Sequence, residues 1–197
     1  MSFFPHAKFL LSANAADQFV PDQGAEVAFA GRSNAGKSSA INTVVQRKQF
    51  ARVSKTPGRT QLVNFFELTS GRRLVDLPGY GFARVSKQMR DHWQTLISDY
   101  FEQRQSLAGL FVIVDIRRGL LDFDRMMLDY AESLEIPAHV LLTKADKLKR
   151  GQAKSAQLKA ARELGERADI QRFSSLSGEG KETARDALQR MLSWPAK

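Results

Sequence analysis

The 197-residue chain contains no cysteine. This absence excludes a disulfide framework and a thiolate metal site, and it fits a reducing compartment. Histidine is scarce as well: His6, His92 and His139 are far apart and lack the spacing of metal ligands. We therefore expect surface or structural roles for the three histidines.

Long apolar runs are also missing. The longest, residues 107–114, is far too short to span a bilayer. The first 15 residues carry a small apolar patch, but no basic residue precedes it and Pro5 interrupts it, so a signal peptide is not expected. The chain shows no lipidation signal, internal repeat or low-complexity segment. With 43% apolar and 26% charged residues, it suits one globular domain.

The central motif is a phosphate-binding P-loop. Residues 31–38 read G-R-S-N-A-G-K-S, which fits the pattern G-x-x-x-x-G-K-S. Its glycines let backbone N–H groups point at phosphate oxygens, Lys37 places an ammonium against the β- and γ-phosphates, and the Ser38 hydroxyl suits Mg²⁺. An apolar run at 26–30 predicts a buried strand before the loop, and 39–45 can continue as a helix. The predicted contacts are Gly31, Arg32, Ser33, Asn34, Ala35, Gly36, Lys37 and Ser38.

A second phosphate motif follows. Residues 62–68 and 72–76 predict two strands whose short connection demands antiparallel pairing. The second strand ends in Asp76-Leu77-Pro78-Gly79, where the carboxylate can hold Mg²⁺ through water and the glycine N–H can sense a γ-phosphate. Residues 46–60 have the composition of an exposed loop, in which Thr56 and Thr60 are both candidates to complete the Mg²⁺ shell.

A third motif, Thr143-Lys144-Ala145-Asp146, indicates which base is bound. The Asp146 carboxylate can accept hydrogen bonds from the N1–H and the exocyclic amine of guanine, a pair of donors that adenine lacks. The stem of Lys144 can lie over the base, and the loop at 174–176 can supply a backbone N–H to the guanine O6. A P-loop nucleoside kinase is disfavoured, because it would need an acceptor site and would leave this motif without a role.

The order of predicted elements indicates an α/β protein. Further strands are expected at 109–115, 137–142 and 170–173, and helices at 87–104, 123–134, 151–166 and 183–192. These elements predict three layers around a mostly parallel six-stranded sheet with one antiparallel edge strand. Residues 1–23 are expected as an irregular lead-in packed on the domain, 24–192 as the domain and 193–197 as a short tail. Every motif follows the C-terminal end of a strand, where such sheets bind ligands.

Acidic residues are missing between Glu26 and Glu67, while the stretch is rich in lysine and arginine, and the whole chain has a net charge of +9. Part of this charge would face a bound nucleotide. The remainder favours a second polyanion, of which RNA is the natural candidate and a membrane surface the weaker one. The alternative is a basic face that is merely solvated.

Together the motifs resemble the EngB (YihA/YsxC) family, within the translation-factor-like GTPases. The segments that carry the resemblance are G-R-S-N-A-G-K-S at 31–38, K-T-P-G-R-T-Q at 55–61, N-F-F at 64–66, D-L-P-G-Y-G at 76–81 and T-K-A-D at 143–146. The resemblance covers roughly residues 5–192 and implies the three-layer P-loop NTPase fold of Ras-like GTPases. The base-contacting loop reads S-S-L instead of S-A-K or S-A-L, which still permits a backbone contact.

The resemblance implies a bacterial, cytoplasmic, monomeric GTPase that binds GTP and GDP and assists assembly of the large ribosomal subunit through its rRNA and proteins. It also implies a role in cell division and septation, with no DNA partner and no membrane insertion. Mg²⁺ would be held by Ser38 and Thr60, and Lys37, Thr60 and Gly79 would be the catalytic residues. Further nucleotide contacts are expected at Gly58, Arg59, Thr60, Gln61, Leu62, Asp76, Leu77, Pro78, Gly79, Thr143, Lys144, Ala145, Asp146, Phe173, Ser174 and Ser175.

Slow intrinsic hydrolysis is expected, because Tyr80 stands where many GTPases carry the glutamine that orients the attacking water. Arg32, Arg59 and Arg84 are available to stabilise charge, and nothing in the sequence selects one. Asn34 offers another route, since in several related GTPases an asparagine at this position helps to bind K⁺. The alternative function is a GTP-sensing module that binds RNA or division proteins and in which hydrolysis is incidental.

Overall fold

The computed structural model describes residues 4–51, 62–81 and 86–193. The strands are β1 (Lys8–Ala13), β2 (Ala25–Gly31), β3 (Val63–Thr69), β4 (Arg72–Asp76), β5 (Leu107–Asp115), β6 (Ala138–Thr143) and β7 (Asp169–Arg172). The α-helices are α1 (Lys37–Val45), α2 (Lys87–Gln103), α3 (Asp122–Ser133), α4 (Arg150–Leu164) and α5 (Lys181–Leu192), and two 3-10 turns, η1 (Ala16–Gln18) and η2 (Ala145–Lys147), complete the set. The strands and helices predicted from residue 24 onward are all present within a few residues of their expected bounds.

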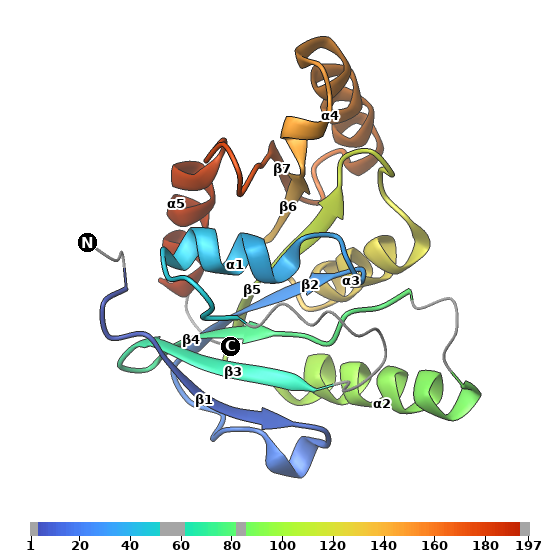
Figure 1. Ribbon diagram of the computed structural model, residues 1–197. Coiled ribbons are helices and arrows are strands. Elements are labelled where there is room, and N and C mark those ends of the chain that lie inside the picture. Colours follow the sequence, from blue (N-terminus) through green and yellow to red (C-terminus); the bar gives the residue numbers. More distant parts are fainter. Residues whose placement is uncertain (1–3, 52–61, 82–85, 194–197) are drawn as a thin grey trace.

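The strands form one sheet in the order β1-β3-β4-β2-β5-β6-β7 (Figure 1). Strand β2 pairs in parallel with β4 and β5, and β5, β6 and β7 continue the parallel part. Strand β3 runs antiparallel to β4 and to β1. The α/β class, the mostly parallel sheet and the antiparallel pairing at one edge are therefore confirmed.

Within the described residues the sheet has seven strands where the sequence predicted six, because the lead-in contributes β1. This segment contains an edge strand instead of being irregular throughout. It is held to β3 by the backbone ladder and by the Ser12 hydroxyl, which donates to Asn64 Oδ1 at 2.6 Å. A bulge between Phe9 and Leu11 breaks the two-residue alternation of side chains, so the strand pattern does not appear in the sequence.

Helices cover both faces of the sheet, which gives three layers (Figure 1). Strand β2 shows the division, since Ala28 and Ala30 face a core shared with α2, α3 and α4, while Val27 and Phe29 face a core shared with α1 and α5. Every residue of β2 and of β5 is buried. Central strands covered on both sides are expected to be apolar, as residues 107–114 of β5 are before the strand ends in Asp115.

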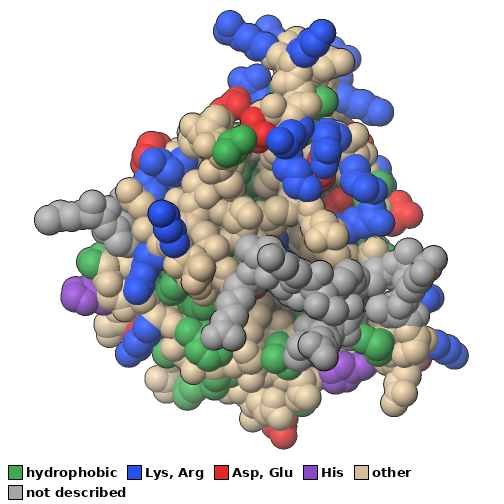
Figure 2. All heavy atoms as spheres, in the orientation of Figure 1, with side chains coloured by type: hydrophobic (Ala, Val, Ile, Leu, Met, Phe, Trp, Pro, Cys, Tyr) green, Lys and Arg blue, Asp and Glu red, His purple; other side chains and the backbone are tan. Residues whose placement is uncertain are grey.

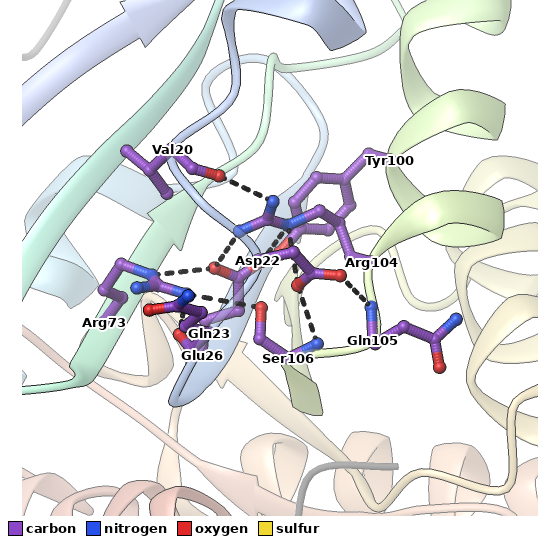
Figure 3. Close-up of polar contacts among 9 residues, drawn as sticks. All are labelled: Val20, Asp22, Gln23, Glu26, Arg73, Tyr100, Arg104, Gln105 and Ser106. Atoms are coloured by element: carbon purple, nitrogen blue, oxygen red, sulfur yellow. Dashed lines mark hydrogen bonds and ion pairs between the residues drawn. The ribbon is translucent and has the colours of Figure 1, made fainter.

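The start of β2 is closed by a buried ion cluster (Figure 3). Glu26 is fully buried and accepts hydrogen bonds from Arg73 Nε at 3.0 Å, from Arg104 Nε and Nη2 at 2.9 Å each, and from the Tyr100 hydroxyl at 3.0 Å. Arg104 also donates to the Val20 carbonyl at 2.8 Å. A buried carboxylate is stable only when its charge and lone pairs are compensated, and here four donors do so.

The same cluster fixes the lead-in to the body of the domain. The Asp22 carboxylate accepts from the backbone N–H groups of Gln105 and Ser106 at 2.8 and 2.9 Å, and Arg73 donates to the Gln23 carbonyl. Residues 20–23 are thereby tied to the end of α2 and the start of β5 (Figure 3). Buried ion pairs and hydrogen bonds therefore hold this end of the sheet together.

Candidate functional site

The P-loop connects the end of β2 to the start of α1, as predicted. Gly36 stands immediately before α1 with φ +100°, a conformation that L side chains rarely adopt, so glycine is required there. Asn34 also has a positive φ of 64°, which asparagine tolerates better than most residues. The loop closes on itself through the Ala35 N–H, which donates to the Arg32 carbonyl at 2.9 Å. The N-terminal N–H groups of α1 follow directly, and such groups bind anions.

The first and second motifs meet through Lys37 and Asp76. The lysine ammonium contacts the aspartate carboxylate, and their side chains are only 12% and 9% exposed. Strand β4 reaches this position beside β2, where the Leu77 N–H donates to the Phe29 carbonyl at 3.0 Å. The Lys37 ammonium and the hard oxygen donors of Asp76 thus lie together at the start of α1, where Ser38 is the next residue.

Gly79 lies against the P-loop. A Cβ at this position would stand 3.1 Å from Ser33 Oγ, and the Ser33 N–H donates to the Tyr80 carbonyl at 2.9 Å. The Ser33 hydroxyl is buried, and within the described residues it has no hydrogen-bond partner. The second motif is therefore held within contact distance of the phosphate loop.

The Tyr80 side chain points into the core. It is 3% exposed, its hydroxyl donates to Asp124 Oδ1 at 2.5 Å, and its ring packs on Trp93 and Phe123. Burial, together with the neighbouring carboxylate, raises the pKa of Tyr80 well above its usual value. This hydroxyl is thus engaged by Asp124 inside the core.

The third motif also contacts the P-loop. The Thr143 hydroxyl lies 2.5 Å from the carbonyl oxygen of Ala35 and 3.0 Å from that of Val114. Lys144 Nζ donates to the Asn34 carbonyl at 2.6 Å. These contacts place the stem of Lys144 between the phosphate loop and the loop that carries Asp146.

Asp115 is a site residue that the sequence analysis missed. Its buried carboxylate lies 2.9 Å from Lys144 Nζ and accepts from Arg117 Nε and Nη2 at 2.9 and 2.7 Å. Burial acts to raise the pKa of Asp115, but the hydrogen bonds from Arg117 and Lys144 hold it well below its usual range. The available signal was an acidic residue ending a buried strand, the same feature that identified Asp76.

Asp146 is prepared to accept hydrogen bonds. The Ser174 hydroxyl donates to Asp146 Oδ1 at 2.6 Å, and this bond lowers the pKa of the carboxyl group. The Ser174 oxygen also accepts from the N–H groups of Leu176 and Ser177 at 3.3 and 3.2 Å, which shapes the loop. An ionised Asp146 beside an ordered loop suits the two donors of guanine.

The other residues predicted to contact the nucleotide differ in burial. Phe173 is fully buried, its N–H donates to the Leu142 carbonyl at 2.9 Å, and its carbonyl accepts from the buried Ala145 at 3.2 Å. Leu77 is buried, the Pro78 carbonyl accepts from Trp93 Nε1 at 3.2 Å, and Ser175 is exposed.

Several predicted residues lie outside the described ranges. These are Thr56, Gly58, Arg59, Thr60, Gln61 and Arg84. Leu62 is described, half-buried, immediately before β3. The expected roles of the first group stay predictions.

A cavity of about 390 Å³ opens beside the P-loop. Its charged and polar lining includes Arg32, Asn34, Asp115, Arg117, Asp124 and Lys144. The side chains around the phosphate loop are therefore mixed in charge with an excess of cations, which suits an anionic ligand. Within the described ranges, no helix is long and apolar enough to cross a membrane.

Comparison with known proteins agrees with this geometry. The family model described as "50S ribosome-binding GTPase" matches residues 26–144. A probable GTP-binding protein EngB of Xylella fastidiosa (strain 9a5c) is 52% identical over 190 residues, 94% of each chain, and one of Stenotrophomonas maltophilia (strain K279a) is 50% identical over 186 residues, 92% of this chain and 93% of that one.

Solved structures share the fold. A crystal structure of a probable GTP-binding protein engB covers 86% of this chain and 99% of its own, with TM-score 0.69 and 22% identity. Era in complex with MgGDPNP and a fragment of 16S ribosomal RNA covers 87% of this chain and 57% of its own, with TM-score 0.62 and 16% identity. The phosphate loop, the aspartate-glycine motif and the guanine motif thus meet on a GTPase fold, and the chain belongs to the EngB family of GTP-binding proteins and hydrolyses GTP.

Proposed function

We propose that this GTPase is a Mg²⁺-dependent switch in assembly of the large ribosomal subunit, and that it is needed for normal cell division and septation. The observation that carries the ribosomal part is the match to the 50S ribosome-binding GTPases over residues 26–144. The net charge of +9 supports a partner rich in RNA. The protein would act in the cytoplasm as a monomer, with precursor rRNA and ribosomal proteins as its partners.

Magnesium fits the donor set of this site. Ser38 follows Lys37 in α1, and Asp76 contacts that lysine, so a hydroxyl and a carboxylate lie on adjacent elements. Hard oxygen donors of this kind suit Mg²⁺. Ser38 and Thr60 would bind the ion directly and Asp76 through water. When bound, the ion neutralises charge on the β- and γ-phosphates.

Lys37 and Gly79 would act on the transferred phosphoryl group. The Lys37 ammonium would stabilise negative charge on the phosphoryl oxygens. The Gly79 N–H would contact the γ-phosphate when GTP is bound. Because Tyr80 is bonded to Asp124 inside the core, we expect slow intrinsic turnover that a partner or K⁺ raises. Asn34 is exposed in the P-loop and is the proposed residue for K⁺. Equal turnover in K⁺ and Na⁺ would exclude that ion.

The ribosomal role is tested by co-sedimentation. Purified protein is mixed with large-subunit precursor particles in GDP or in a non-hydrolysable GTP analogue, across a salt series. We expect tighter association in the GTP form, weakening steeply as salt rises. No association in either state would remove the ribosomal role and leave GTP hydrolysis standing.

The second candidate is a GTP-sensing module in which hydrolysis is incidental, and the buried Tyr80 side chain favours it. The two functions differ in how the partner is released. A Ser38→Ala or Thr60→Ala variant that binds GTP without hydrolysing it should stay bound to the precursor if hydrolysis drives release. Normal release by that variant would favour the sensing module.

A further inference from the structure

Helix α4 carries a row of exposed cations. Arg150, Lys154 and Arg162 are separated by four and eight residues and therefore project from one side of the helix, with Leu158 between them at 48% exposure. At 1.5 Å per residue the row is about 18 Å long. We call these three cations the α4 basic row. Figure 2 shows lysine and arginine side chains gathered over the part of the surface that α4 forms.

This row opposes the usual electrostatics of a helix. Arg150 and Lys154 are like charges four residues apart, which repel each other. The first turn contains no acidic residue, and Lys149 and Arg150 stand where the positive end of the helix dipole disfavours cations. A sequence that breaks local rules without internal compensation indicates a functional position. A bound polyanion would remove both conflicts.

Unlike the α4 basic row, two neighbouring arginines form ion pairs with acidic side chains. Arg125 of α3 donates to Glu163 at 2.6 Å, and Arg167 donates to Glu132 at 2.8 Å. Glu163, the acidic residue of α4, is thus engaged by an arginine of α3, and Arg167 beyond the helix is paired with α3 as well. Among the residues that the structure describes, no acidic side chain forms an ion pair with a member of the α4 basic row. Its charge is available to an external partner.

We propose that the α4 basic row binds the phosphate backbone of structured ribosomal RNA, an inference that rests on the proposed function. Lysine and arginine on a helix surface neutralise phosphates without reading sequence, and the net charge of +9 gives attraction at longer range. A lipid surface fits less well, because membrane-bound helices present a broad apolar face. On the described surface of α4, Leu158 is the one exposed large apolar side chain.

The row also begins close to the guanine site. Residues 147–149 alone separate Asp146 from the first residue of α4. RNA on the α4 basic row would therefore lie beside the loop that recognises the base. The RNA contact and the nucleotide contact would share one short segment of chain.

The experiment compares two triple variants of the full chain. The test variant is Arg150→Gln, Lys154→Gln and Arg162→Gln, in which glutamine preserves helix propensity. The control variant is Arg72→Gln, Arg90→Gln and Arg190→Gln, which removes the same charge from exposed positions outside α4. Binding to a short RNA duplex and to deproteinised large-subunit rRNA is measured from about 50 to about 200 mM salt. Thermal unfolding and affinity for a fluorescent GDP analogue check that each variant is folded.

We expect the slope of log affinity against log salt to become shallower by about 2 to 3 in the test variant and by less than about 1 in the control. Equal losses in the two variants, or no loss in either, would overturn the proposal. Wild-type binding to anionic vesicles but to neither RNA would also overturn it. If the wild type binds no RNA yet sediments with precursor particles, the α4 surface is wrong while the proposed function stands. If the wild type neither binds RNA nor sediments with precursor particles, the α4 proposal and the proposed function both fail.

Discussion

The two ends of β2 both carry contacts between cations and carboxylates, but they use charge in opposite ways. At the start of the strand, Glu26 is sealed among two arginines and a tyrosine. At the other end, Lys37 contacts Asp76 beside a loop of backbone N–H groups. The first arrangement saturates a charge inside the protein, whereas the second keeps charged groups at a site where a ligand can replace their contacts. Changes at one end should therefore alter stability, and changes at the other should alter binding.

The largest expected effect is on base selectivity, at the ligand end. Asp146→Asn replaces an acceptor by a group that also donates, so guanine loses its matched partner. We expect the preference for GTP over xanthosine triphosphate (XTP) to fall by a factor on the order of 10⁴. Competition binding with GDP and XDP measures it, and unfolding in urea should change by less than about 1 kcal/mol. Unchanged selectivity would remove Asp146 from the base site.

The next effect belongs to the sealed end. Glu26→Ala leaves Arg73 and Arg104 without their buried carboxylate, so the free energy of unfolding should fall by about 3 to 5 kcal/mol. Urea denaturation measures this loss. Glu67→Gln is the control, because its partner Lys8 is 64% exposed and the pair should contribute less than about 1 kcal/mol. Similar losses in the two variants would mean that burial of Glu26 does not increase its contribution to the free energy of unfolding.

Asp115 is a buried carboxylate at the ligand end of the sheet, so Asp115→Asn should alter both stability and binding. Loss of its charge-assisted hydrogen bonds with Lys144 and Arg117 should cost about 1.5 to 3 kcal/mol. Affinity for GDP should fall as well, since Lys144 contacts the P-loop. Isothermal titration and urea denaturation separate the two effects. A purely structural Asp115 would leave affinity unchanged once the variant is folded.

The stability provided by Asp115 should depend on pH in a defined direction. Its folded pKa lies below the unfolded value of about 3.9, so its contribution is complete above about pH 5 and is lost as pH falls toward the folded pKa. The difference in unfolding free energy between wild type and Asp115→Asn should therefore shrink between about pH 6 and about pH 3. A difference that is constant over this range would contradict the ion pairs.

The smallest effect is expected at Tyr80. Tyr80→Phe removes one hydrogen bond to Asp124, which still accepts from the Leu121 N–H at 2.9 Å, so the loss should be about 1 to 2 kcal/mol. Single-turnover GTP hydrolysis should change by less than about twofold, because the hydroxyl is engaged by Asp124 inside the core. A large drop in the hydrolysis rate at unchanged GTP affinity would give Tyr80 a catalytic role.

The sequence was informative where local chemistry demands particular residues. Gly36 needs its positive φ, Lys37 and Asp146 need their charges, and the apolar run of β5 needs two covering layers, so each could be read in isolation. The strand β1 could not, because a bulge and an exposed face hide its alternation. Asp115 was missed although it ends a buried strand, because its role depends on Lys144, which reaches it from the end of the neighbouring strand β6. Contacts set by tertiary packing have no local pattern.

The buried cluster at Glu26 also sets an order of events in folding. Its partner Arg104 lies 78 residues further along the chain. Strand β2 pairs with β4 and β5, both of which follow it in sequence, so the strand that carries the phosphate loop stays incomplete until β5 has been added. Contacts of such sequence separation slow folding because a long loop must close first. On an emerging chain, guanine nucleotide binding would therefore be acquired only after more than half of the protein has been synthesised.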